Sequence, residues 1–105
     1  MPMANTIAPP VAKSGTSNES NAIRWVQRDN TVNVTLYGYT PSTSSVVSIT
    51  GLPKPIDYQI ARFMNNTGYL GYMEWSSSSS RWEIQGSQGS GVAIYGSFTY
   101  LTDEF

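Results

Sequence analysis

The sequence predicts an all-β fold, a small antiparallel β-sandwich of jelly-roll-like type with about seven strands. Ser, Thr, Asn and Gly are abundant, while charged residues make up only 12% of the 105 residues. That composition is typical of a β domain with many turns. Short stretches of alternating apolar and polar residues recur between turn signals, and no segment of helical period is long enough to compete with them.

Residues 1–21 are predicted to form a linker or arm, because prolines and Gly15 interrupt a run of small polar residues that has no period. Such an arm joins a domain to a preceding segment or lies along a neighbour. A disordered tail fits the same composition equally well. The folded head domain is therefore expected to span residues 22–105.

The first predicted hairpin is centred on Asp29 and Asn30, two residues that tolerate positive φ and suit a two-residue turn. Apolar and polar residues alternate on both sides of the turn. Three pairs are then expected on the core face, namely Ile23 with Leu36, Trp25 with Val34, and Gln27 with Val32. The opposite face is mostly polar, which is typical of a half-buried antiparallel pair.

The middle of the chain is predicted to hold a short strand at residues 46–50, followed by an extended loop. Pro53 and Pro55 lack backbone N–H donors, so this loop cannot be a central strand. Further strands are expected at residues 58–65, 69–76, 81–86 and 91–101, with a turn at 65–68 and a glycine-rich loop at 86–91. The register across the turn at 65–68 stays open, because a two-residue and a three-residue loop pair different residues.

The stretch YMEWSSSSSRWEIQG is predicted to form another hairpin, with two tryptophans beside a serine turn. A two-residue turn at Ser78 and Ser79 sets Trp75 opposite Trp82 and separates polar from apolar side chains. A five-residue serine loop would instead pair Trp75 with Arg81 and direct Trp82 to the polar face. We prefer the two-residue turn, although two serines are a poor pair for positive φ.

The two tryptophans have two interpretations. In the preferred register, both face the core as a cross-strand aromatic pair. At an open rim, one indole would instead stack on a sugar ring. We prefer the core interpretation, because side chains alternate between the two faces of a strand.

The polar face of this hairpin holds candidates for an exposed ligand site. Glu74 and Glu83 lie opposite each other in the preferred register, and Arg81 is placed to bridge both. Charged groups of this kind bind saccharide hydroxyls through charge-assisted hydrogen bonds. The full set of candidate ligand-binding residues is Asp57, Tyr72, Glu74, Trp75, Arg81 and Trp82.

The composition argues against several classes of function. The net charge is −1 and the six Lys and Arg residues are scattered, so we expect no nucleic-acid partner. No apolar run approaches the length of a membrane span, and the N-terminus lacks the pattern of a signal peptide. With no Cys and no His, the chain has no disulfide, no thiolate chemistry and none of the usual zinc sites.

We predict that the chain is not an enzyme, and that it uses no cofactor and no metal. Carboxylates are the remaining candidates for catalysis, and a pair of them would need a deep cleft. A sandwich of 105 residues rarely forms such a cleft. The serines have no histidine to activate them.

Three groups of residues occur in an order that is more telling than any one of them. They are Trp25, Arg28, Asn30, Val32 and Val34 in the first hairpin, then Leu52, Pro53 and Pro55 in the loop, and then Gly96, Ser97, Thr99 and Tyr100 near the C-terminus. Together they resemble the C-terminal head domains of tail-fibre, baseplate and receptor-binding proteins from siphophages of Gram-positive bacteria. Asp29 departs from that pattern, since a glycine is more usual there.

The resemblance implies a head domain in the virion, made in the host cytoplasm, that forms a homotrimer about the fibre axis beside other tail or baseplate proteins. It also implies a host cell-surface ligand, a cell-wall saccharide or teichoic acid, bound weakly by each copy and firmly by many. Two alternatives remain. One is a structural trimerisation or cap module without a ligand, and the other is a carbohydrate-binding module of a cell-wall-active protein.

Overall fold

The computed structural model describes residues 12–41, 46–65, 70–86 and 92–104, which form an all-β fold without a helix. Its eight antiparallel strands are β1 (Ala12–Thr16), β2 (Ile23–Arg28), β3 (Thr31–Tyr39), β4 (Val47–Ile49), β5 (Ile60–Asn65), β6 (Leu70–Ser76), β7 (Arg81–Gly86) and β8 (Ile94–Leu101). The predicted fold class is confirmed.

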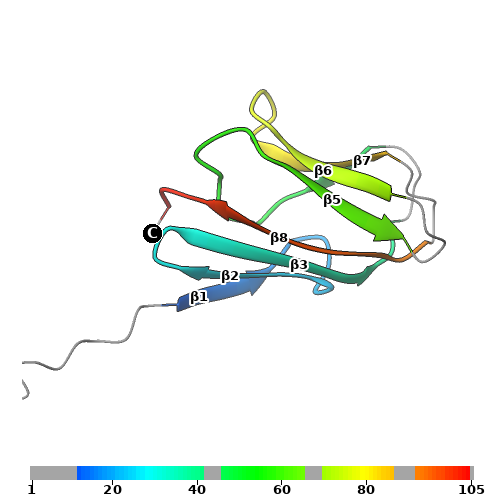
Figure 1. The fold of residues 1–105 in the computed structure, drawn as a ribbon, viewed down its shortest axis with the longest axis horizontal. Coiled ribbons are helices and arrows are strands. Elements are labelled where there is room, and N and C mark those ends of the chain that lie inside the picture. Colours follow the sequence, from blue (N-terminus) through cyan, green and yellow to red (C-terminus); the bar gives the residue numbers. More distant parts are fainter. Residues whose placement is uncertain (1–11, 42–45, 66–69, 87–91, 105) are drawn as a thin grey trace, which may run out of the picture.

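The strands follow the hydrogen-bonded order β1-β2-β3-β8-β5-β6-β7-β4 in a sheet that curls over on itself. β5 and β8 pair through Met64 opposite Tyr95 and Asn65 opposite Ile94. Beyond this corner they diverge, so β1, β2, β3 and β8 form one layer, which β5, β6 and β7 face from the other (Figure 1). The two layers form a sandwich that is joined along one side.

The sheet begins inside the predicted linker of residues 1–21. Strand β1 pairs along its whole length with β2. Gly15 lies against the Trp25 indole, and a Cβ there would come within 3.0 Å of Nε1. Residues 12–16 were predicted as part of a linker but form a strand. The prediction missed this strand because its pairing with β2 holds it in place, whereas its own sequence has no strand pattern. The predicted linker's residues 1–11 lie outside the described residues.

The registers follow strand parity. The β2–β3 pairs are those predicted, with Trp25 opposite Val34, and Asp29 turns the chain with a φ of 53°. In the second layer, Met64 lies opposite Leu70, which settles the register of β5 and β6. The predicted turn at 65–68 and the glycine-rich loop at 86–91 fall largely outside the described residues.

The core lies between the two layers and centres on Trp82. This indole is 1% exposed, and its ring centroid lies 5.9 Å from that of Trp75 and 5.3 Å from those of Phe98 and Tyr100. Aromatic pairs at such distances stabilise a core beyond the area they bury. The other buried apolar residues include Ile23, Val32, Val34, Leu36, Ile49, Phe63, Met73, Ile84 and Ile94.

The proline-containing loop between β4 and β5 is bound to the end of β8. The Tyr100 hydroxyl donates to the Pro53 carbonyl at 2.5 Å, and the Thr102 hydroxyl donates to the Lys54 carbonyl at 2.6 Å. Apart from a single bridge at Pro55, the loop makes no strand pair, as predicted. These bonds hold the loop against the end of β8, which belongs to the other layer.

Candidate functional site

The β6–β7 hairpin has the register that separates polar from apolar side chains. Trp75 lies opposite Trp82, and Ser76 lies opposite Arg81. The turn contains four residues rather than two, and Ser80 takes the positive φ, 52°. Both turns give the strands the same parity, so the preferred register is confirmed and the five-residue serine loop is excluded.

Both tryptophans of this hairpin face the core. Trp75 is 8% exposed and Trp82 is 1% exposed, so neither presents a ring face that could stack on a sugar. The core interpretation is confirmed, and the two indoles leave the set of candidate ligand contacts. The physical reason is parity, since odd positions of β6 and even positions of β7 point inward.

The outward side of this hairpin and one tyrosine from the β4–β5 loop form what we call the carboxylate face: Tyr58, Tyr72, Glu74, Arg81, Glu83 and Gln85. Within the hairpin, Glu74 lies directly opposite Glu83, as the preferred register requires. Two carboxylates in such positions repel each other unless each has partners. The structure supplies separate partners for the two.

Glu74 is held by two side chains, one on each carboxylate oxygen. The Tyr58 hydroxyl donates to Oε2 at 2.7 Å, and Gln85 Nε2 donates to Oε1 at 2.5 Å. The hydrogen bond to Glu74 raises the pKa of Tyr58, and the nearby negative charge adds to this effect. The Glu74 carboxylate therefore has a defined orientation at the surface.

Glu83 pairs with Arg81, whose Nη2 lies 3.2 Å from Oε2. The Arg81 side chain is 40% exposed and that of Glu83 is 17% exposed. Arg81 was expected to bridge both glutamates, and this expectation was wrong. Tyr58 and Gln85 occupy the Glu74 oxygens, so the guanidinium turns along its own strand instead.

Two predicted site residues remain, Tyr72 and Asp57. Tyr72 is half-buried on the carboxylate face, opposite Gln85. Asp57 is exposed on the loop just before Tyr58, and it forms no hydrogen bond or ion pair with the described residues. Tyr58 was not among the predicted site residues, because no local sequence pattern links this loop residue to Glu74 on β6.

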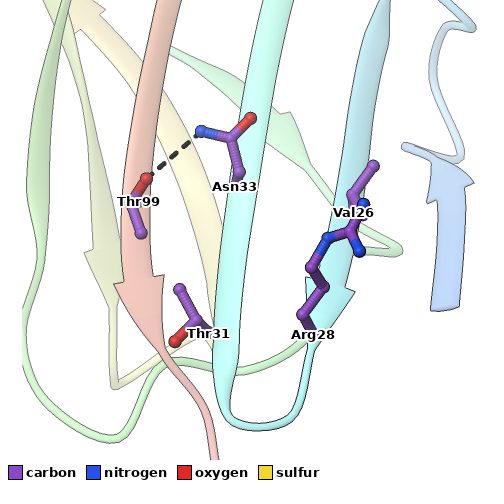
Figure 2. A pocket seen from close by; sticks show the side chains of 5 residues that line it. All are labelled: Val26, Arg28, Thr31, Asn33 and Thr99. Carbon is purple, nitrogen blue, oxygen red and sulfur yellow. Dashed lines mark hydrogen bonds between the residues drawn. The ribbon is translucent and has the colours of Figure 1, made fainter. Parts of the chain in front are cut away.

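The other layer carries a different surface, which we call the arginine face. It consists of outward residues of β2, β3 and β8: Arg24, Val26, Arg28, Thr31, Asn33, Thr35, Ser97 and Thr99. All of them are exposed. Figure 2 shows part of this face, a hollow of about 310 Å³ lined by Val26, Arg28, Thr31, Asn33 and Thr99.

No protein-family model and no curated protein matches this sequence. Within the described ranges, no three acidic side chains lie together as metal ligands would. The same part of the chain has no helix of the length and apolar character that a membrane span requires.

Proposed function

We propose that this chain is the head domain of a phage tail-fibre or baseplate protein, and that it binds a saccharide of the host cell wall during adsorption. The order of its motifs along the chain supports the phage context. The observation that carries the binding proposal is the Glu74 carboxylate, held by Tyr58 and Gln85 on the surface of a rigid sheet.

Saccharide hydroxyls need acceptors whose position is set before binding. Glu74 and Glu83 present such acceptors, and each is already oriented by its own partner, so little side-chain entropy is lost on binding. Tyr58 is 61% exposed beside them and offers an aromatic ring for the apolar C–H groups of a sugar. A flat site of this kind binds weakly, and many copies on one particle would supply avidity.

Cosedimentation of the purified chain with cell walls isolated from a panel of Gram-positive bacteria tests the proposal. We expect Glu74→Ala to reduce binding at least about tenfold to a cell wall that the unmodified chain binds. The variant loses the carboxylate charge and the two oriented oxygens that would accept hydrogen bonds from the saccharide. Thr16→Ala, an exposed change on β1, is the matched control and should bind as the unmodified chain does. Equal binding by the two variants would contradict the assignment of the carboxylate face.

One observation favours the second function, a structural module that forms a homotrimer. Tyr37, Tyr95 and Met64 lie in one row across β3, β8 and β5 and are 70%, 41% and 51% exposed. Exposed apolar groups that adjoin one another often form subunit contacts. Light scattering should then give a trimer mass that falls to the monomer mass in Tyr37→Ser, and a monomer at all concentrations would reject this function.

A further inference from the structure

The two guanidinium groups of the arginine face have no acidic partner. Among the described residues, the ion pair within 4.0 Å is that of Arg81 with Glu83, on the other layer. Arg28 makes no hydrogen bond with a described residue, and Arg24 uses only Nε, which donates to the Asn21 carbonyl at 3.1 Å. Both arginines thus keep their terminal N–H donors free for a ligand.

The outward side of this layer contains no carboxylate on any strand. In β1 to β3 and in β8, the residues that share the side of Arg24 and Arg28 are small, hydroxyl-bearing, amide, apolar or tyrosine side chains. Asp29 and Asp103 follow the ends of strands, and neither pairs with Arg28. The strand residues of this side therefore carry the two arginine charges and no negative charge, although the whole chain has a net charge of −1.

A row of hydrogen-bonding groups lies beside the arginines and is held in place by Asn33. Its Nδ2 donates to Thr99 Oγ1 at 3.2 Å and to the Phe98 carbonyl at 3.3 Å, and its Oδ1 accepts from Thr35 Oγ1 at 3.5 Å. In Figure 2, Asn33 and Thr99 meet across β3 and β8, while Arg28 runs back along β2 toward Val26. The arginine and the hydroxyl row thus flank the same hollow.

Two hollows lie along the strands of this face, one beside Arg28 and one beside Arg24, and we call the two together the track. The first, of about 310 Å³, contains Arg28, and a second, of about 450 Å³, is lined by Ala22, Arg24, Thr35 and Tyr37. Both volumes lie in the range of about 300–1,000 Å³ that is usual for ligand sites. Arg24 and Arg28 are four strand residues apart, so their Cα atoms are separated by about 13 Å along β2. A small anion could engage one of them, whereas a chain with repeated charges could engage both.

We propose that the arginine face is a second binding site, which takes an acidic polysaccharide with carboxylate or phosphate groups along its length. Arg28 and Arg24 each bind one oxyanion through paired N–H donors. Thr31, Asn33 and Thr99 bind the sugar hydroxyls between them. The site is independent of the carboxylate face and does not depend on the phage assignment.

A saccharide fits this face better than a nucleic acid, because single-stranded nucleic acids need exposed rings on which bases stack. The hollow beside Arg28 has no aromatic lining residue, and the single ring that lines the second hollow, Tyr37, packs edge to face against Tyr95, so the described residues offer no series of rings for successive bases.

Three polymers with one backbone test this site on the full chain by isothermal titration calorimetry: neutral dextran, carboxymethyl-dextran and phosphorylated dextran. We expect the charged polymers to bind and neutral dextran not to bind, and the tighter of the two identifies the preferred oxyanion. Binding should weaken as salt is raised, because the contacts are exposed charges. Free glucuronate should bind far more weakly than the carboxymethylated polymer, since it reaches one arginine at a time.

Arg28→Gln should weaken binding of the preferred polymer at least about tenfold, because a charge-assisted pair of hydrogen bonds is lost. Arg62→Gln removes the same charge from an exposed position on β5, where Arg62 forms no ion pair with a described residue, and should change the affinity less than about twofold. Equal losses in the two variants would show unspecific attraction and overturn the proposal. Absence of binding by both charged polymers, or equally tight binding of an oligothymidylate, would overturn it as well. Cell-wall binding that depends on Glu74 is measured separately and is unaffected by either result.

Discussion

The two outward faces of the sandwich differ in whether their charged side chains have partners. On the carboxylate face, Glu74 and Glu83 are half-buried and each has a partner within the face. On the arginine face, Arg24 and Arg28 are exposed and have no acidic partner in the described part of the chain. A charge that is already hydrogen-bonded is oriented but partly satisfied, whereas an unpaired charge keeps its full capacity for a ligand. The same core therefore supports one surface whose charged side chains have partners within the face and one whose arginines are unpaired among the described residues.

The largest expected effect concerns the core that both faces share. Trp82→Ala should lower the free energy of unfolding by about 3–5 kcal/mol, because it removes the central ring of the aromatic cluster. Urea denaturation measures this loss, and binding at both faces should fail together at temperatures where the variant unfolds. A variant of unchanged stability would show that the two faces do not rest on a common core.

Tyr100→Phe should have a smaller effect, about 1–3 kcal/mol, because it leaves the buried Pro53 carbonyl without its donor. This bond ties β8, in the layer of the arginine face, to the loop that carries Tyr58 of the carboxylate face. Tyr95→Phe, at an exposed position of the same strand, is the control and should stay close to the unmodified chain. Equal stability of the two variants in urea would rule out this link between the layers.

The Tyr100 contribution should also depend on pH. Burial raises the pKa of the Tyr100 phenol above that of the unfolded chain. The neutral phenol is thus favoured by folding, and its contribution is fully present below the ordinary tyrosine pKa of about 10. As pH rises beyond that value toward the folded-state pKa, the stability difference between the unmodified chain and Tyr100→Phe should shrink. A difference that grows in alkali would contradict this sign.

Substitution of the paired Arg81 and of the unpaired Arg28 should change the stability of the protein by different amounts, and both changes should be smaller than those above. Arg81→Gln deprives the half-buried Glu83 of its ion pair and should cost up to about 1 kcal/mol, reduced by solvent screening at the exposed guanidinium. Arg28→Gln removes an unpaired surface charge and should change stability by less than about 0.5 kcal/mol. Thermal unfolding of both variants at low salt measures the difference. A greater loss for Arg28→Gln would mean that the arginine face holds a structural contact.

The smallest expected effect is spectroscopic. Glu74→Gln replaces the charged acceptor of the Tyr58 hydrogen bond with a neutral amide and removes the nearby negative charge, so the pKa of this phenol should fall toward its ordinary value. Titration of tyrosinate absorbance, compared with Tyr58→Phe, identifies the phenol that moves. An unchanged titration curve would show that Glu74 and Tyr58 are not coupled in solution.

Much of the local structure follows from sequence patterns. Alternation and the Asp29–Asn30 turn predicted the β2–β3 register, and parity across the serine run predicted that Trp75 and Trp82 face inward. These features depend on neighbours in the chain, so local rules are sufficient. The number of residues in the serine turn was predicted wrongly, yet parity preserved the register.

Other features were decided only by tertiary structure. Strand β1 exists because it pairs with β2 and covers Trp25, and its own residues carry no strand pattern. Tyr58 reaches Glu74 because the loop bound to β8 returns the chain beside β6. The hollow beside Arg28 forms because β8 inserts next to β3 and brings Thr99 to Asn33. The sequence by itself determined which residues face inward, since that depends on alternation along each strand. The tertiary structure decided which outward residues meet, because that depends on contacts between strands distant in the chain.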